Sequence, residues 1–144
     1  MAEGACLMVL IDTTVWVDFF SDRSQPHVAA LQRMIEDDED LCICGVILTE
    51  VLQGVRSDAD FRKTKDYFES LIVIPMRQVT FERSASLYRS LRKRGVTIRK
   101  PIDCMIAAVA IEHALPLLHN DRDFGQIAKH SKLKVMDPKK PTKR

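Results

Sequence analysis

Five carboxylates in this sequence stand where short apolar runs end or begin. Asp12 directly follows the run LMVLI, Glu50 lies early in the segment after LCIC, and Asp103 comes two residues after Pro101 at the start of a long apolar stretch. Asp121 and Asp123 follow PLLH. Taken singly, an acid in such a place is a helix cap, a partner of a helix dipole, a turn residue or plain surface. Taken together, the five predict a cation site.

The apolar runs and the segments between them predict strands that alternate with helices. The predicted strands cover residues 7–11, 41–44, 72–75, 116–119 and 133–136. The predicted helices begin after Asp12 and at Pro101, and otherwise cover residues 26–38, 46–55, 58–71, 80–94 and 121–130. This alternation is typical of an α/β fold in which a mostly parallel sheet carries helices on both faces.

The parallel sheet is what gathers the acids. Strand carboxyl ends and the helix starts that follow them share one edge of such a sheet, and ligands bind there. Carboxylates that lie close together repel each other and raise one another's pKa values, so a cation is needed to neutralise them. An all-oxygen set without His or Cys suits Mg²⁺ or Mn²⁺, ions that also bind phosphates. The acids therefore indicate phosphoryl chemistry.

The charge distribution is compatible with a polyanionic substrate. The formal net charge is only +2, but six basic residues precede Asp103: Arg89, Arg92, Lys93, Arg94, Arg99 and Lys100. A second basic run closes the chain, at Lys139, Lys140, Lys143 and Arg144. Basic groups beside an acidic site would attract a polyanion. The alternative is a solvated helix face followed by a disordered tail.

Length and cysteine content limit the class of protein. The 144 residues predict one domain. The cysteines Cys6, Cys42, Cys44 and Cys104 have no C-x-x-C spacing, so we expect small buried side chains, without a zinc site or a disulfide framework. The N-terminal apolar run, residues 5–11, is too short to span a membrane. These features predict a cytoplasmic, reduced protein.

Four segments taken in order resemble a PIN domain. They are VLIDTTVW around Asp12, TEVLQG around Glu50, RKPIDCMIAAVA around Asp103, and LLHNDRDF around Asp121, and the resemblance runs from about Leu7 to Asp137. The small size is similar to that of the VapC toxins of prokaryotic toxin–antitoxin pairs. The resemblance implies a three-layer α/β/α sandwich with a mostly parallel central sheet. It also implies one PIN domain over residues 1–138, followed by a basic tail, 139–144.

The resemblance also implies roles for individual residues. The catalytic acids would be Asp12, Glu50, Asp103 and Asp121. The metal ligands would be Asp12, Asp103, Asp121 and Asp123, and the last two could exchange roles. Thr13 would orient a water or phosphate at the metal. The expected RNA-backbone contacts are Arg92, Lys93, Arg94, Arg99 and Lys100.

By the same resemblance, the expected activity is that of an Mg²⁺-dependent endoribonuclease, with Mn²⁺ as a possible substitute. The expected substrate is structured RNA such as tRNA, and the expected partners are a cognate antitoxin and a second copy of the chain, with no membrane. Trp16, Phe19 and Phe20 could line the antitoxin groove, although core packing explains Trp16 equally well.

Three other readings remain open at this point. The chain could be a PIN nuclease of RNA maturation that has no antitoxin. It could be a silent PIN-like binding module, although all the acidic positions are filled. A phosphoacceptor receiver domain shares the βα alternation, but it would not explain Glu50 together with Asp103.

Overall fold

The central sheet has four parallel strands in the order β3–β2–β1–β4. The computed structural model describes residues 8–140. The strands are β1 (Val9–Ile11), β2 (Leu41–Cys44), β3 (Ile72–Ile74) and β4 (Leu117–Leu118). β1 lies in the middle, with Val9 opposite Leu41 on one side and Leu10 opposite Leu117 on the other. All of β1 and β2 is buried, as expected for strands covered on both faces.

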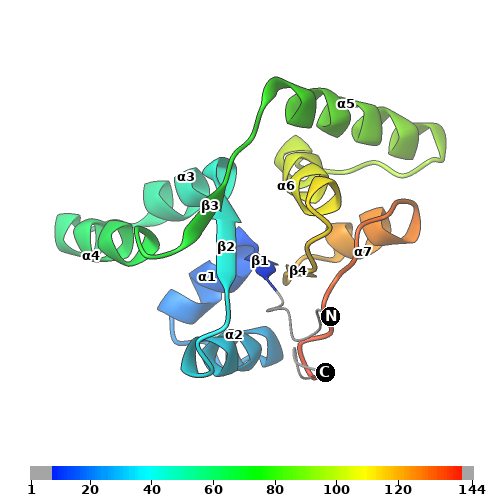
Figure 1. Cartoon of the computed structure of the whole chain (residues 1–144). Helices are drawn as coiled ribbons and strands as arrows, with labels where there is room; N and C mark the ends of the chain where they lie inside the picture. Colours follow the sequence, from blue (N-terminus) through cyan, green and yellow to red (C-terminus); the bar gives the residue numbers. More distant parts are fainter. Residues whose placement is uncertain (1–7, 141–144) are drawn as a thin grey trace, which may run out of the picture.

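Seven helices connect and cover these strands within the described residues. They are α1 (Thr13–Phe20), α2 (Pro26–Glu36), α3 (Gly45–Gly54), α4 (Asp58–Phe68), α5 (Gln78–Lys93), α6 (Pro101–Glu112) and α7 (Arg122–Lys129). The chain moves from β1 to β2 and on to β3 toward one edge of the sheet. It then crosses back from β3 to β4 at the other edge. Because parallel crossovers are right-handed, α1–α4 cover one face and α5–α7 the other (Figure 1). The predicted three-layer α/β/α fold is confirmed.

Two helices end two or three residues earlier than the sequence predicted, and each has a local cause. α2 stops at Glu36 rather than at residue 38, because Asp38 adopts a positive φ of 56° that a right-handed helix does not allow. α4 stops at Phe68 rather than at residue 71, and the Ser70 hydroxyl there donates to the Tyr67 carbonyl. Gly95 follows α5 with φ of 81°, as its place after that helix predicted.

The predicted fifth strand, residues 133–136, is wrong. Only an isolated parallel bridge forms there, between Leu117 and Val135. Its partner β4 is just two residues long and offers a short ladder. The chain then turns at Asp137, whose side chain accepts a hydrogen bond from the Lys139 backbone.

The aromatic residues after Asp12 divide between the core and the surface. Trp16 is fully buried, its indole N–H donates to the Ile11 carbonyl at 3.2 Å, and its ring centroid lies 4.9 Å from that of Phe68. Phe20 is 43% exposed. Trp16 therefore belongs to the core, while Phe20 remains available to a partner.

Several sequence predictions fall at the limits of the described chain. Cys42, Cys44 and Cys104 are buried free thiols, as predicted, whereas Cys6, Leu7, Lys143 and Arg144 lie outside the described residues. The domain boundary at residue 138 stays a prediction. No helix within residues 8–140 has the length and apolar character needed to cross a membrane.

Candidate metal and nuclease site

Asp103 is a buried carboxylate in the first turn of α6. Pro101 occupies the first helical position, where a missing N–H costs nothing. Most of the helix from Asp103 to Ala110 is buried. Asp103 itself is 2% exposed. Its Oδ2 has no hydrogen-bond partner, alone among the buried side-chain nitrogens and oxygens of residues 8–140. A buried, unpaired carboxylate oxygen is costly unless a cation satisfies it.

Asp121 and Asp123 meet Asp103 from the start of α7. Asp121 caps this helix by accepting the Asp123 N–H at 2.9 Å. The three carboxylates each offer one oxygen, and these oxygens lie within 4.8 Å of one another. Asp121 and Asp123 therefore each bring an oxygen to the same cluster. Either of them could be the direct ligand, as the sequence predicted.

Asp12, between β1 and α1, and Glu50, on α3, border these three acids. Asp12 is buried at the end of β1 and caps α1, and its Oδ2 accepts both the backbone N–H of Thr14 at 3.0 Å and its hydroxyl at 2.6 Å. Glu50 accepts the Thr13 hydroxyl at 2.6 Å. Asp12 is not one of the three acids whose oxygens converge, and its Oδ2 is already bonded to Thr14.

Burial and the charges of neighbouring carboxylates raise the pKa values of Asp103 and Asp12. Burial raises the pKa of Asp103 to about 7; Lys100 opposes this shift, and the charges of Asp121, Asp12 and Asp123 add to it. Burial also raises the pKa of Asp12, against the Thr14 hydrogen bonds and with a contribution from Glu50. The charges of Asp121, Asp123 and Asp12 thus act on Asp103, and that of Glu50 acts on Asp12.

Two basic side chains face the acids. Arg99 lies 3.3 Å from Asp123 through Nε and 3.7 Å from Asp121. The Lys100 ammonium lies 3.5 Å from Asp121 and 4.0 Å from Asp103. Burial opposes the charge of Lys100, but the neighbouring acids outweigh it and raise the pKa of the ammonium.

The other three predicted basic contacts lie at the C-terminal end of α5. Arg92 and Lys93 are in the last turn of α5, and Arg94 follows as its C-cap. The Arg92 guanidinium stacks over the Tyr88 ring, 5.7 Å from its centroid. Of the five, Arg99 and Lys100 are thus the pair placed on the acids.

The residues present fit a hard divalent cation. Three converging carboxylates and one buried oxygen without a partner are a donor set of oxygens alone, which Mg²⁺ and Mn²⁺ prefer. Asp103, Asp121 and Asp123 could hold the ion directly, with Asp12 close enough to add charge or to hold a water. The cluster supports divalent metal binding without selecting between the two ions.

Sequence reasoning assigned no role to three residues that hold this site together. The Thr14 hydroxyl also accepts the backbone N–H of Asn120, at 2.9 Å, and so ties the Asp12 cap to the loop before Asp121. His119 Nδ1 accepts the Asp121 N–H at 3.1 Å, and burial lowers the pKa of its ring, which favours the neutral form that can accept. The sequence signals that could have indicated these roles were a hydroxyl residue two positions after Asp12 and an Asn directly before Asp121.

Comparison with known proteins agrees with this geometry. The sequence profile of the PIN domain matches residues 9–130. This chain belongs to the PIN-domain family. The curated relatives include the VapC ribonuclease Mb1587 of Mycobacterium bovis and ribonuclease VapC11 of Mycobacterium tuberculosis. Each is 31% identical over 130 residues, which span 89% of this chain and 97% of the relative. The predicted VapC type and nuclease class are confirmed.

Solved structures share the fold. VapBC2 of Rickettsia felis, bound to a DNA fragment from its promoter, superposes with a TM-score of 0.72 at 17% identity, over 90% of this chain and 98% of that one. VapBC-1 of nontypeable Haemophilus influenzae superposes with a TM-score of 0.71 at 18% identity, over 93% and 100% of the two chains. At these identities the likeness establishes the PIN fold of the chain.

The raised pKa of Asp103 predicts the pH dependence of stability in the metal-free protein. Folded Asp103 keeps its proton up to about pH 7, whereas the unfolded chain releases it near its ordinary value of 3.8. The folded state binds more protons in this window, so stability falls as the pH rises from about 4 through 7. In EDTA at pH 8, urea unfolding should give Asp103→Asn a higher free energy of unfolding than the parent, by at most about 4 kcal/mol. The difference should shrink as the pH falls, and near pH 4 the two should be similar.

Added Mn²⁺ provides the control. It should raise the melting temperature of the parent at pH 8 and leave that of Asp103→Asn unchanged, because only the parent keeps the ligand. A variant less stable than the parent at pH 8 in EDTA would assign Asp103 to the dipole of α6 rather than to a cation site.

Proposed function

We propose that this protein is a Mg²⁺-dependent endoribonuclease toxin that acts in the cytoplasm, cleaves structured RNA such as tRNA, and is neutralised by a cognate antitoxin. Mn²⁺ would substitute for Mg²⁺. The observation that carries the proposal is the unpaired buried oxygen of Asp103 beside two converging carboxylates. Membership of the VapC ribonucleases supports the substrate class, and the reduced buried cysteines suit the location.

A bound divalent ion supplies Lewis-acid chemistry, since it lowers the pKa of a water and stabilises negative charge on the phosphate. Asp103, Asp121 and Asp123 would hold it, and Asp12 would share its charge. Glu50, fixed by the Thr13 hydroxyl, is placed to orient or deprotonate a water. The Thr13 hydroxyl donates to Glu50, and its predicted role at a metal-bound water or phosphate stays a prediction.

No protein nucleophile is proposed. Cys104 is the thiol beside Asp103, and burial raises its pKa to about 11, so it stays protonated at neutral pH. We propose instead that a water attacks the phosphorus and that the bond from phosphorus to O3′ breaks, which leaves a 5′-phosphate and a 3′-hydroxyl.

Cleavage of tRNA by the purified protein tests the proposal. With Mg²⁺ we expect discrete fragments with 5′-phosphate ends, and with EDTA none. Asp103→Asn and Glu50→Gln should lose more than the roughly 10–100-fold that the loss of an outer-shell partner costs. Asp22→Asn, a change of the same kind away from the acids, should cleave as the parent does.

Each failure of this experiment has a distinct meaning. Ends that carry a 2′,3′-cyclic phosphate would contradict hydrolysis by water. A well-folded, antitoxin-free protein that cleaves no RNA would instead favour the silent binding module.

Arg99 and Lys100 would contact RNA phosphates. Both are more than half exposed along their side chains while their charged ends face the acids, so they lie at the mouth of the site. Once a divalent ion neutralises the carboxylates, these two cations become available to the substrate backbone. This supports them over Arg92, Lys93 and Arg94 as the contacts closest to the scissile phosphate.

The Arg99→Gln, Lys100→Gln double variant should weaken binding of tRNA and lower the slope of log affinity against log salt by up to about two. Binding is measured in an Asp12→Asn background with Mg²⁺, so that the RNA stays intact. Lys132→Gln with Lys134→Gln is the matched control, because the Lys134 carbonyl accepts from Leu117 at the opposite end of β4. An unchanged slope in the first pair would remove both residues from the interface.

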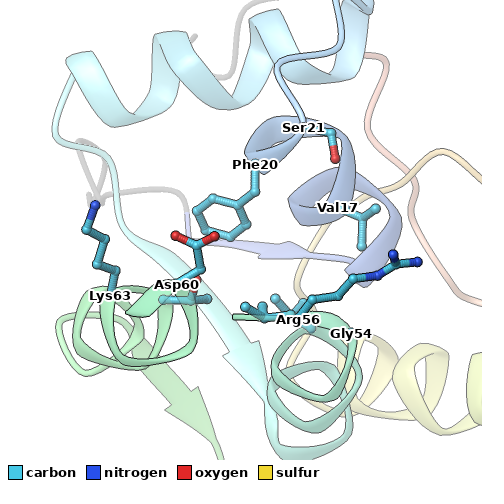
Figure 2. Close-up of a pocket in the computed structure, with 10 residues that line it drawn as sticks. Val17, Phe20, Ser21, Gly54, Arg56, Asp60 and Lys63 are labelled. Carbon is cyan, nitrogen blue, oxygen red and sulfur yellow. The ribbon is translucent and has the colours of Figure 1, made fainter. Parts of the chain in front are cut away.

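A groove between α1, α3 and α4 supports an antitoxin partner. It has a volume of about 640 Å³, and its apolar wall comes from Val17, Phe20, Val51 and Val55. Arg56, Lys63 and Asp60 surround this wall, and Figure 2 shows Asp60 directed toward Phe20 across the groove. Because α3 also carries Glu50, a segment seated here would lie close to the site. The structures named above contain VapBC pairs.

The antitoxin segment should offer an apolar side chain to Phe20 and acidic side chains to Arg56 and Lys63. Phe20→Ala should weaken binding of the small protein encoded beside this gene by roughly tenfold, as an interface anchor does. Phe81→Ala, which changes an equally exposed Phe on α5, is the control. Equal loss in both variants would move the antitoxin elsewhere, and absence of any such neighbouring gene would favour the RNA-maturation nuclease. The homodimer stays a prediction.

A further inference from the structure

A loop beside the acids is attached twice to one face of α1. Asn120 immediately precedes Asp121, and its backbone N–H donates to the Thr14 hydroxyl at 2.9 Å. Its side-chain Nδ2 donates to Asp18 Oδ2 at 3.3 Å. Thr14 and Asp18 are four residues apart and so lie on the same face of the helix. The residue before a candidate ligand is thus held at both its backbone and its side chain.

Asp18 is itself held from α2. His27 is 4% exposed, and its Nε2 donates to Asp18 Oδ2 at 2.6 Å. Arg23 Nε lies 3.6 Å from the other oxygen of Asp18. The same Asp18 oxygen therefore receives a buried His and the loop Asn, and the carboxylate has little freedom to rotate away from the loop.

This set of contacts ends at two of the site acids. The Thr14 hydroxyl that receives Asn120 donates in turn to Asp12 Oδ2, at 2.6 Å. Asn120 is bonded directly to Asp121, whose own N–H is received by His119. A continuous set of hydrogen bonds therefore links α2, α1 and the loop to Asp12, and the peptide bond between Asn120 and Asp121 joins the loop to the second acid.

We propose that Asp18, fixed by His27, is a positioning residue that acts through Asn120 to place Asp121 at the ion site. The inference rests on the proposed metal-dependent function and assigns Asp18 no contact with ion or substrate. Partners that orient a ligand from outside are expected to matter, because a carboxylate that must find its position on binding holds the ion more weakly. The competing explanation is that the Asp18–His27 pair only joins α1 to α2.

The test uses Asp18→Ala and Asn120→Ala, singly and together, with Asp22→Asn as the matched acid change at the end of α1. Asn120 is exposed, so its variant keeps the fold even if Asp18→Ala proves unstable. Two readouts are taken on folded protein. The first is hydrogen exchange of the Asn120 and Asp121 amides in EDTA, and the second is the Mn²⁺ affinity by calorimetry.

We expect faster exchange of these two amides and a roughly tenfold weaker Mn²⁺ affinity in both single variants. The double variant should be no worse than the worse single one, since both changes break the same link. Asp22→Asn should match the parent in both readouts.

Three results would overturn the inference. Exchange unchanged in Asp18→Ala and Asn120→Ala would show that the link does not order the loop. Faster exchange with parental Mn²⁺ affinity would leave the pair a purely structural joint. A parent that binds no Mn²⁺ would remove the proposed function itself and the positioning role with it, an outcome distinguishable from the other two because it appears in the unmodified protein.

Discussion

Mutual repulsion among buried carboxylates is the constraint on which the rest of this structure depends. Asp103 cannot turn to water, because the helix that carries it is buried along nearly its whole length and the side chain is 2% exposed. Its pKa of about 7 expresses first the cost of charging a buried group, and the charges of the other acids add to that cost. Lys100 offsets part of that cost, yet one oxygen of Asp103 has no partner. An ion that binds between the acids would relieve this repulsion and give the unpaired oxygen of Asp103 a partner.

The fold provides further compensation through its helix starts. Asp12 caps α1, Asp121 caps α7, and Asp103 lies in the first turn of α6, so three helix N-termini meet at the carboxyl edge of the sheet. Each N-terminus carries a partial positive charge and free N–H groups, which favour an acid in the first turn. The capping explanation and the metal explanation of these acids are therefore compatible. A capping acid is fixed in orientation, and a fixed carboxylate is what a metal ligand requires.

Much of this arrangement follows from sequence pattern, and the rest depends on contacts that pattern does not encode. Asp12, Asp103 and Asp121 could be placed at one edge because parallel strands and right-handed crossovers leave little choice of topology. The strand over residues 133–136 was wrong because its β-propensity had no long partner strand to pair with. The link from Asp18 to Asn120 joins residues 102 positions apart, and neither residue type signals it locally. Lys100 was expected to meet RNA, and its contact with Asp121 depends on the turn before α6.

The most direct test of the central claim is the position of Mn²⁺ in crystals of the protein, found from its anomalous scattering at neutral to basic pH. The account predicts a peak bonded to oxygens of Asp103, Asp121 and Asp123, with the Lys100 ammonium moved away from Asp121. A peak elsewhere, or no peak in crystals soaked at millimolar Mn²⁺ while Lys100 keeps its contact, would contradict it. In that case the two basic side chains, rather than an ion, would be the partners of these carboxylates.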